Sequence, residues 1–172
     1  PSGKERLNYM EQWDLYTAAR EKTGAVIARG QAIPQGFYHL SVSVWIVNTA
    51  GQFLLSQRHP DKTYPLRWEC TGGCALAGEN SLQAAVREVR EELGLVLDPQ
   101  KGRCIRQQRR EAEQDLYDVW LFRRDVPLEQ LTLQPSEVVG ARWVSFPELL
   151  RLWQAGQLHP LLDDLDSLPQ FL

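Results

Sequence analysis

The segment Arg87–Gly94, REVREELG, places three glutamates within five consecutive positions: Glu88, Glu91 and Glu92. On a helix, like charges three or four residues apart repel each other, and each such pair costs about 0.2–0.5 kcal/mol. Glu88 and Glu92 are four residues apart, so they would lie one turn above the other on a shared edge of a helix. Arg87 precedes Glu91 by four residues and is placed for an ion pair with it. The crowded acidic edge still needs something that neutralises Glu88 and Glu92.

A hard divalent cation would neutralise Glu88 and Glu92. Mg²⁺ and Mn²⁺ prefer carboxylate, carbonyl and water oxygens as ligands, and two carboxylates one helical turn apart can approach one such ion. A solvated, charged helix face is the other interpretation of the same residues, and such faces are common. The short segment alone leaves both interpretations open.

The residues around these glutamates predict the helix that carries them. Apolar residues recur at helical spacing through residues 81–93, at Leu82, Ala85, Val86, Val89 and Leu93. Asn80 or Ser81 can cap the beginning of this helix, and Gly94 is placed for the left-handed turn that ends many helices.

Most of the remaining elements are predicted to be strands. Segments that are β-branched, aromatic or alternating in character occur at residues 13–18, 24–30, 38–48, 52–58, 68–73, 103–110, 116–124 and 140–146. Residues 59–67 contain two prolines and are expected to form a loop. Further helices are expected at residues 147–156 and 160–168. Glu111, Glu113 and Asp115 surround a predicted hairpin turn, and we expect them to be solvated. Strand pairs with a few helices imply an α/β protein whose mixed sheet packs between helices.

Length and composition indicate one ordinary globular domain. The 172 residues suffice for a single sizeable core, and the net charge of −3 gives no broad electrostatic footprint for nucleic acid. No apolar run is long enough to span a bilayer, and the beginning of the sequence has no long apolar stretch typical of a signal peptide. Three cysteines, Cys70, Cys74 and Cys104, are too few for a disulfide framework and favour a reducing compartment. We therefore expect a cytoplasmic protein with neither a membrane nor a nucleic acid as partner.

A longer motif surrounds the glutamates. The segment Gly73–Leu95, GCALAGENSLQAAVREVREELGL, fits the pattern G-x5-E-x7-R-E-U-x-E-E-x-G-U at every fixed position, where U is a bulky aliphatic residue. This pattern is the Nudix box, and the sequence resembles the Nudix hydrolase superfamily. A match of this length is highly specific, which favours the metal-binding interpretation over a solvated helix face.

The resemblance implies a fold, an activity and roles for individual residues. It implies a Nudix-type α/β/α sandwich with a mixed β-sheet, and a hydrolase that cleaves a diphosphate linkage in a small molecule with the help of Mg²⁺ or Mn²⁺. Glu88 and Glu92 are implied as metal ligands, with Glu91 close by or ligating and the carbonyl of Gly72 completing the coordination. The box residues implied to have structural roles are Gly73, Glu79, Arg87 and Gly94.

Other residues are candidates for catalysis and substrate binding. The general base is expected to be Glu88 or an acid from another loop, and Glu137, six residues before Trp143, is the candidate in the latter case. Arg58 and Lys62 end a strand and enter the following loop, so they are candidates for binding the substrate phosphates.

The chain is expected to form a single Nudix domain. Its parts would be an extension with short strands at residues 1–36, a core at residues 37–150 and a helical segment at residues 151–172. Extensions of this kind often form dimer surfaces in relatives, so a homodimer is also an expectation.

A second family within the same superfamily also matches part of the sequence. The segment Tyr38–Lys62 resembles isopentenyl-diphosphate isomerases, in which a histidine at the position of His39 ligates a metal ion and residues at Arg58 and Lys62 meet the diphosphate. The isomerases, however, have a catalytic cysteine, a glycine and a metal-binding histidine where this chain has Gly72, Gly73 and Cys74. The complete glutamate set favours the hydrolase. A non-catalytic Nudix-fold regulator that binds a ligand is the third interpretation.

Overall fold

Helix α2 spans Ser81–Leu93, as the sequence predicts, in a computed structural model that describes residues 11–172. Asn80 accepts a hydrogen bond from the backbone N–H of Gln83, and the Gln83 side chain accepts one from the N–H of Asn80, which completes a capping box. At the other end, Gly94 adopts φ 66°, and its N–H donates to the Arg90 carbonyl. The glycine is needed there because side-chain-bearing residues rarely adopt a positive φ.

The main sheet has a continuous half built on two long parallel strands. Strand β3, His39–Val47, pairs with β8, Asp115–Arg123, along its whole length. Strand β7, Arg103–Arg110, adds to β8 in antiparallel orientation, and β6, Thr71–Cys74, adds to β3 in the same way. The predicted strands in this half of the sheet are therefore confirmed.

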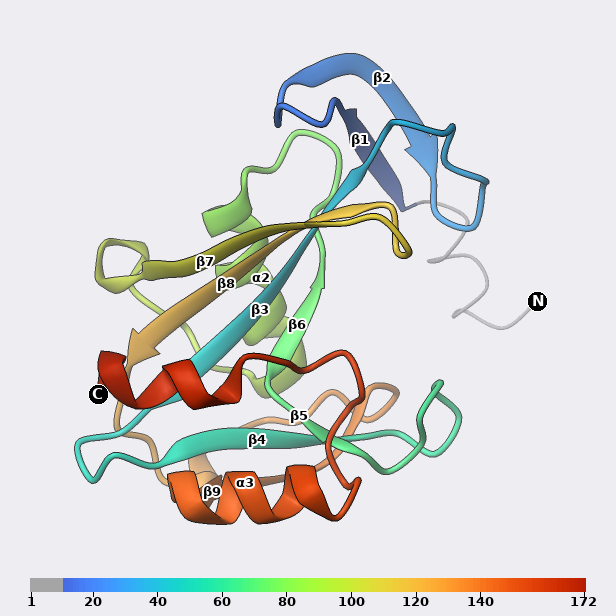
Figure 1. The fold of residues 1–172 in the computed structure, drawn as a ribbon. Helices are drawn as coiled ribbons and strands as arrows, with labels where there is room; N and C mark the ends of the chain where they lie inside the picture. The colour runs from blue at the N-terminus through green and yellow to red at the C-terminus, as the bar shows by residue number, and fades with distance from the viewer. Residues whose placement is uncertain (1–10) are drawn as a thin grey trace.

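The other half of the sheet diverges from the first. Strand β4, Phe53–Arg58, lies between β5, Trp68–Glu69, and β9, Val138–Val144, and is antiparallel to both. Strands β3 and β4 meet at the pair Val47 and Phe53 and then separate, as Figure 1 shows. The chain from β5 to β6 crosses from one half to the other, and it leads directly into the predicted motif.

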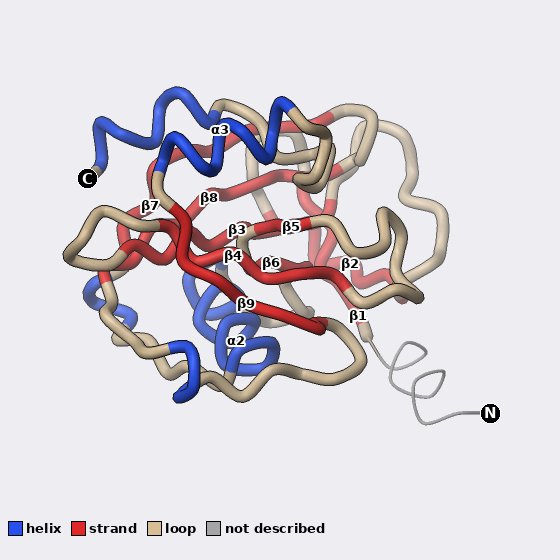
Figure 2. The backbone as a smooth tube through the Cα atoms, turned by 90° about the horizontal axis from the view of Figure 1, so that it is seen from below, coloured by secondary structure: helices blue, strands red, loops and turns tan. Residues whose placement is uncertain are grey.

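Helices cover both faces of the sheet, which confirms the predicted α/β/α arrangement (Figure 2). Helix α2 packs on one face over a core that includes Val42, Val44 and Val89. Helix α3, Phe146–Gln154, and the 3₁₀ helix η3, Leu165–Phe171, cover the opposite face over Trp45, Phe53 and other apolar residues. Short 3₁₀ helices also occur at Pro99–Lys101 (η1) and Leu128–Gln130 (η2).

A two-stranded hairpin stands outside the main sheet. Strand β1, Gln12–Tyr16, pairs in antiparallel orientation with β2, Lys22–Ala28, as the sequence predicts. Figure 1 shows this hairpin beside the end of the sheet where the loop between β6 and α2 emerges. The first ten residues of the predicted extension lie outside the described residues.

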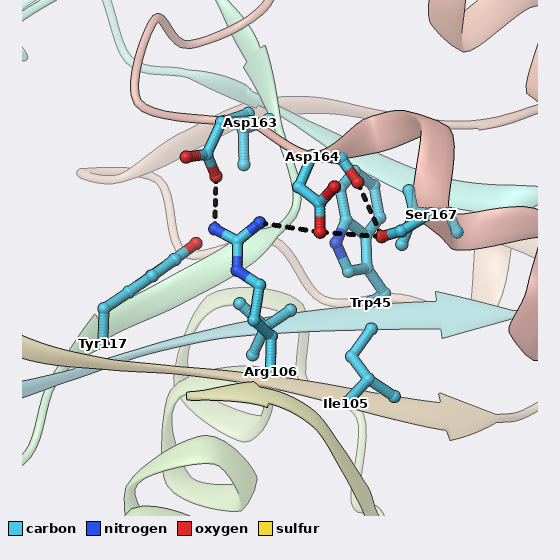
Figure 3. A pocket seen from close by; sticks show the side chains of 10 residues that line it. Trp45, Ile105, Arg106, Tyr117, Asp163, Asp164 and Ser167 are labelled. Carbon is cyan, nitrogen blue, oxygen red and sulfur yellow. Dashed lines mark hydrogen bonds and ion pairs between the residues drawn. The ribbon is translucent and has the colours of Figure 1, made fainter. Parts of the chain in front are cut away.

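The prediction of a last helix at residues 160–168 is wrong in position and type. The structure has the 3₁₀ helix η3 at Leu165–Phe171, and Asp164 before it adopts φ 52°, which interrupts a regular helix. At this turn, Arg106 of β7 forms ion pairs with both Asp163 and Asp164, as Figure 3 shows, and the three residues help to line a cavity of about 20 Å³. No helix within residues 11–172 combines the length and the apolar character that a bilayer crossing requires.

Candidate active site

Helix α2 directs two of its three glutamates toward the interior of the protein. The Glu92 residue is only 6% exposed and the Glu88 side chain 14%, whereas the Glu91 side chain is 45% exposed. Burial raises the pKa of Glu88 to about 7, because the nearby Arg87 offsets only part of the cost of removing the carboxylate from water. Burial and then the charge of Glu88 raise the pKa of Glu92 well above its ordinary value. As anions, Glu88 is thus only partly compensated by Arg87, and Glu92 is compensated less.

Arg87 links the helix to the loop that precedes it. Its Nε donates to Glu79 at 2.6 Å, and its Nη1 donates to Glu88 at 2.9 Å and to Glu91 at 3.1 Å. Its Nη2 also donates to the main-chain carbonyl of Cys74 at 2.9 Å. This one guanidinium therefore fixes the box loop, the end of β6 and the Glu88 carboxylate relative to one another, while Glu92 forms no ion pair with any residue in 11–172.

Two glycines allow β6 to lie close to its neighbours. A Cβ atom at Gly73 would stand 2.9 Å from Glu88 Oε2 and closer still to Oε1. A Cβ atom at Gly72 would collide with the Val42 carbonyl and lie 3.3 Å from the Ser43 Cα. Gly73 therefore provides the space in which the Glu88 carboxylate lies against β6.

Lys62 and Glu137 meet at the edge of the same region. The Lys62 ammonium forms an ion pair with the Glu137 carboxylate, and the N–H of His59 donates to the main-chain carbonyl of Glu137 at 3.0 Å. The charges of Lys62 and Glu137 both act on Glu92, Lys62 lowering its pKa and Glu137 raising it. The structure therefore brings the predicted residues Lys62 and Glu137 together with the buried glutamates of α2.

Arg58 lies in the same part of the molecule but is already occupied. Its Nη1 donates to both carboxylate oxygens of Glu69, at 3.0 and 2.9 Å, and its Nε donates to the Thr63 carbonyl at 2.7 Å. The Arg58 side chain is 10% exposed. Its hydrogen bonds hold β4, β5 and the following loop together, and they leave Lys62 as the more accessible of the two predicted phosphate ligands.

The oxygen donors suit a hard divalent cation that retains water. Within residues 11–172, no three His, Cys, Asp or Glu side chains are close enough together to enclose a metal ion completely. Mg²⁺ is usually bound through only one or two carboxylates, together with waters and substrate phosphates. The buried Glu88 and Glu92, with the adjacent main chain of Gly72, fit this mode of binding.

The cysteines do not provide a reactive thiolate. Burial raises the pKa of Cys70 and of Cys74 to about 12, so both thiols are protonated near neutral pH. His39 is buried and stacks on Trp13, with ring centroids 4.4 Å apart, and its Nδ1 has no hydrogen-bond partner among the described residues. The protonated thiols of Cys70 and Cys74 therefore give no support to thiol chemistry at this site.

Two residues near the site were not predicted from the sequence. Glu69 is a partly buried acid whose charge acts on Glu92, and its position depends on the pairing of Ser56 with Glu69 across β4 and β5. Arg29 follows β2 in the hairpin and lies within the electrostatic range of Cys74 and Glu137. No local pattern in the sequence indicates how β5 or the hairpin would pack against the motif.

Comparisons with known proteins identify the family and the fold to which this chain belongs. Residues 37–165 match the NUDIX domain family. An uncharacterised Nudix hydrolase from Listeria monocytogenes is 41% identical over 153 residues, which cover 88% of this chain and 89% of the relative. A crystal structure of a Deinococcus radiodurans protein superposes with a TM-score of 0.73 at 24% identity and covers 94% of this chain and 98% of that one, which shows the shared fold.

One relative belongs to the alternative family. An isopentenyl-diphosphate Delta-isomerase from Cutibacterium acnes is 30% identical over 149 residues, which cover 74% of this chain and 75% of the relative. The identity with the Listeria hydrolase is higher and extends over more of both proteins. The chain belongs to the Nudix family and is a Nudix hydrolase, an enzyme that acts on pyrophosphate bonds.

Proposed function

We propose that this protein hydrolyses a diphosphate linkage in a nucleoside-diphosphate-X or a related small molecule, with Mg²⁺ or Mn²⁺ as cofactor. The observation that carries the proposal is the pair of inward-facing carboxylates on α2, the buried Glu92 and the largely buried Glu88. Both have a raised pKa, and Glu92 has no ion-pair partner within residues 11–172. Burying such carboxylates costs stability in the absence of a cation, and this cost is typical of functional sites.

The two glutamates would hold the cation, and the main-chain carbonyl of Gly72 would complete the protein ligands. A divalent cation bound there would neutralise the anionic phosphates, act as a Lewis acid and make water more acidic. The Arg87 guanidinium holds the Glu88 carboxylate in place through Nη1 at 2.9 Å, so that the ligand geometry is set before a substrate arrives.

Two groups are candidates for accepting the proton of the attacking water. Glu88 is the first, because its carboxylate would lie beside the bound cation, which keeps it deprotonated and makes the water more acidic. Glu137 lies at the start of β9 and is paired with Lys62. A substrate phosphate that attracted Lys62 would release Glu137 to act as a base, so Lys62 would serve both the phosphate and the carboxylate in turn.

The test is a hydrolysis assay across a panel of diphosphate compounds, with and without Mg²⁺ or Mn²⁺. We expect release of phosphate or a nucleoside monophosphate that depends on the metal, and we expect Glu92→Gln to abolish it. Full activity in Glu92→Gln would refute the site assignment. Conversion of isopentenyl diphosphate to dimethylallyl diphosphate would instead support the isomerase, and binding without turnover of any compound would support a regulator.

A further inference from the structure

Arg29 is a fixed but accessible cation at the end of the β1–β2 hairpin. Its Nη1 donates to Glu11 at 2.8 Å, and its guanidinium carbon lies 6.0 Å from the centre of the Trp13 ring. Its backbone N–H donates to the Glu11 carbonyl at 3.0 Å, which extends the strand pairing past β2. The side chain is nonetheless 49% exposed, so the guanidinium can still meet a ligand from solvent.

The hairpin is attached directly to the loop of the Nudix box. The N–H of Ala77 donates to the Gln12 carbonyl at 2.7 Å, and the N–H of Gly78 donates to the Asp14 carboxylate at 2.8 Å. Trp13 also packs near Cys74, at the end of β6, within a small apolar cluster. These contacts hold Arg29 beside the strand that carries Gly72 and Gly73, and Figure 1 shows the hairpin next to this loop.

Arg29 also lies within the electrostatic field of the active site. Burial lowers the pKa of Arg29, but the hydrogen bond and charge of Glu11, together with the charge of Glu137, raise it overall. Cys74 ends β6, and Glu137 immediately precedes β9. Arg29 is thus linked to the end of β6 through the Trp13 ring, and it lies within the electrostatic range of Glu137 at the start of β9.

The other basic groups near these glutamates already have acidic partners. Arg58 is 10% exposed and forms two hydrogen bonds with Glu69, and Lys62 is paired with Glu137. Arg29 has an acidic partner too, but Glu11 leaves its side chain half exposed. A guanidinium binds phosphate through two parallel hydrogen bonds, which a buried and committed arginine cannot offer to a substrate.

We propose that Arg29 binds a phosphate group of the substrate, so that the N-terminal hairpin supplies part of the substrate site. This inference rests on the proposed diphosphate hydrolysis. Arg29 would release the Glu11 carboxylate, or share its N–H donors between that carboxylate and a phosphate of the substrate. The other oxygens of this phosphate would bind the cation that the α2 glutamates hold. Because Arg29 would bind the substrate, its loss should mainly raise KM.

The test compares two variants that break the same ion pair. Arg29→Gln removes the guanidinium, whereas Glu11→Gln removes its partner and leaves the guanidinium in place. For Arg29→Gln we expect KM for the diphosphate substrate to rise about tenfold or more, with kcat changed less, because a charge-assisted hydrogen bond to the substrate is lost. For Glu11→Gln we expect KM to stay within about twofold of wild type or to fall. Arg29→Lys should lie between, since it keeps the charge but not the fork.

Calorimetric binding of imidodiphosphate in magnesium buffer provides a readout that does not need turnover. We expect Arg29→Gln to weaken this binding and Glu11→Gln to preserve it. Unchanged binding in Arg29→Gln, equal losses in both variants, or no binding by the wild type would overturn the inference. A wild-type protein that cleaved no diphosphate, yet bound imidodiphosphate through Arg29, would refute the proposed hydrolysis alone. Normal hydrolysis with an unaffected Arg29→Gln would refute the role of Arg29 alone.

Discussion

Gly73→Ala tests whether the Glu88 carboxylate must lie against β6. The added Cβ atom would stand 2.9 Å from Glu88 Oε2 and closer to Oε1, whereas ordinary contacts begin near 3.4 Å. Because Oε1 is the nearest atom, the carboxylate or the strand must move by about 1 Å to restore an ordinary contact. Gly73 is not among the glycines with positive φ, so alanine brings no strain of its own to the backbone.

The expected effect on activity is larger than the effect on stability. A displacement of this size in a catalytic group lowers kcat by about 10–100-fold. The free energy of unfolding should fall by only about 1 kcal/mol, because the atoms that must yield are the far end of a side chain rather than main chain. Steady-state hydrolysis and urea unfolding measure the two quantities on the same preparation.

A double-mutant cycle identifies the group that causes the effect. If the clash is with Glu88, Gly73→Ala should cost stability in the wild type and close to nothing in a Glu88→Ala background, where the new methyl group occupies vacated space. Activity within twofold of wild type, or an equal loss of stability in both backgrounds, would refute the placement of Glu88 against Gly73.

Two further predictions concern stability in the absence of metal. Because the folded-state pKa of Glu88 is about 7, the native state holds a proton that the unfolded state releases near pH 4.5, so stability should fall as pH rises between these values. Urea unfolding in EDTA should show this slope, and an equal slope in Glu88→Gln would contradict it. Arg58→Gln should lower the free energy of unfolding by about 3–5 kcal/mol, because it leaves the carboxylate of Glu69 unpaired and largely out of water. Lys62→Gln should lower the free energy of unfolding by less than about 1 kcal/mol, because the pair of Lys62 with Glu137 is partly exposed. Equal costs in urea unfolding would show that Arg58 is not the structural residue described here.

The sequence predicts α2 correctly because its signals are local. The apolar spacing, the cap at Asn80 and Gly94 all act within the helix or one residue beyond it, and the observed bounds Ser81–Leu93 agree with the prediction. The strands are predicted for the same reason, since alternation and turn residues are properties of short segments. The strong match to the Nudix box adds the order of the layers, which no local pattern contains.

Predictions about single charged side chains are less successful because they depend on pairing between distant segments. Arg58 remains a predicted phosphate ligand, and its ion pair with Glu69 depends on the pairing of β4 with β5, which no local pattern contains. Asp115 was expected to be solvated at a turn and is instead 2% exposed. Arg110, five residues earlier, and Ser41 donate hydrogen bonds to it, and this contact requires the parallel pairing of β3 with β8.

The C-terminal segment shows a further limit of local patterns. Residues 160–168, PLLDDLDSL, contain leucines and aspartates at spacings that suit an amphipathic helix. The structure instead has a turn followed by a 3₁₀ helix, and Asp163 and Asp164 pair with Arg106, which lies on a strand more than fifty residues earlier. The same dependence on distant packing explains why no local pattern in the sequence pointed to Arg29.

Metal uptake is the most direct test of the central claim that buried carboxylates on α2 exist to hold a divalent cation. The measurement is a calorimetric titration of the metal-free protein with Mn²⁺ in the presence and absence of imidodiphosphate, repeated with Glu92→Gln. We expect saturable Mn²⁺ binding by the wild type, strengthened by imidodiphosphate and lost or severely weakened in the variant. Absence of uptake by the wild type under both conditions, or equal uptake by Glu92→Gln, would contradict the account.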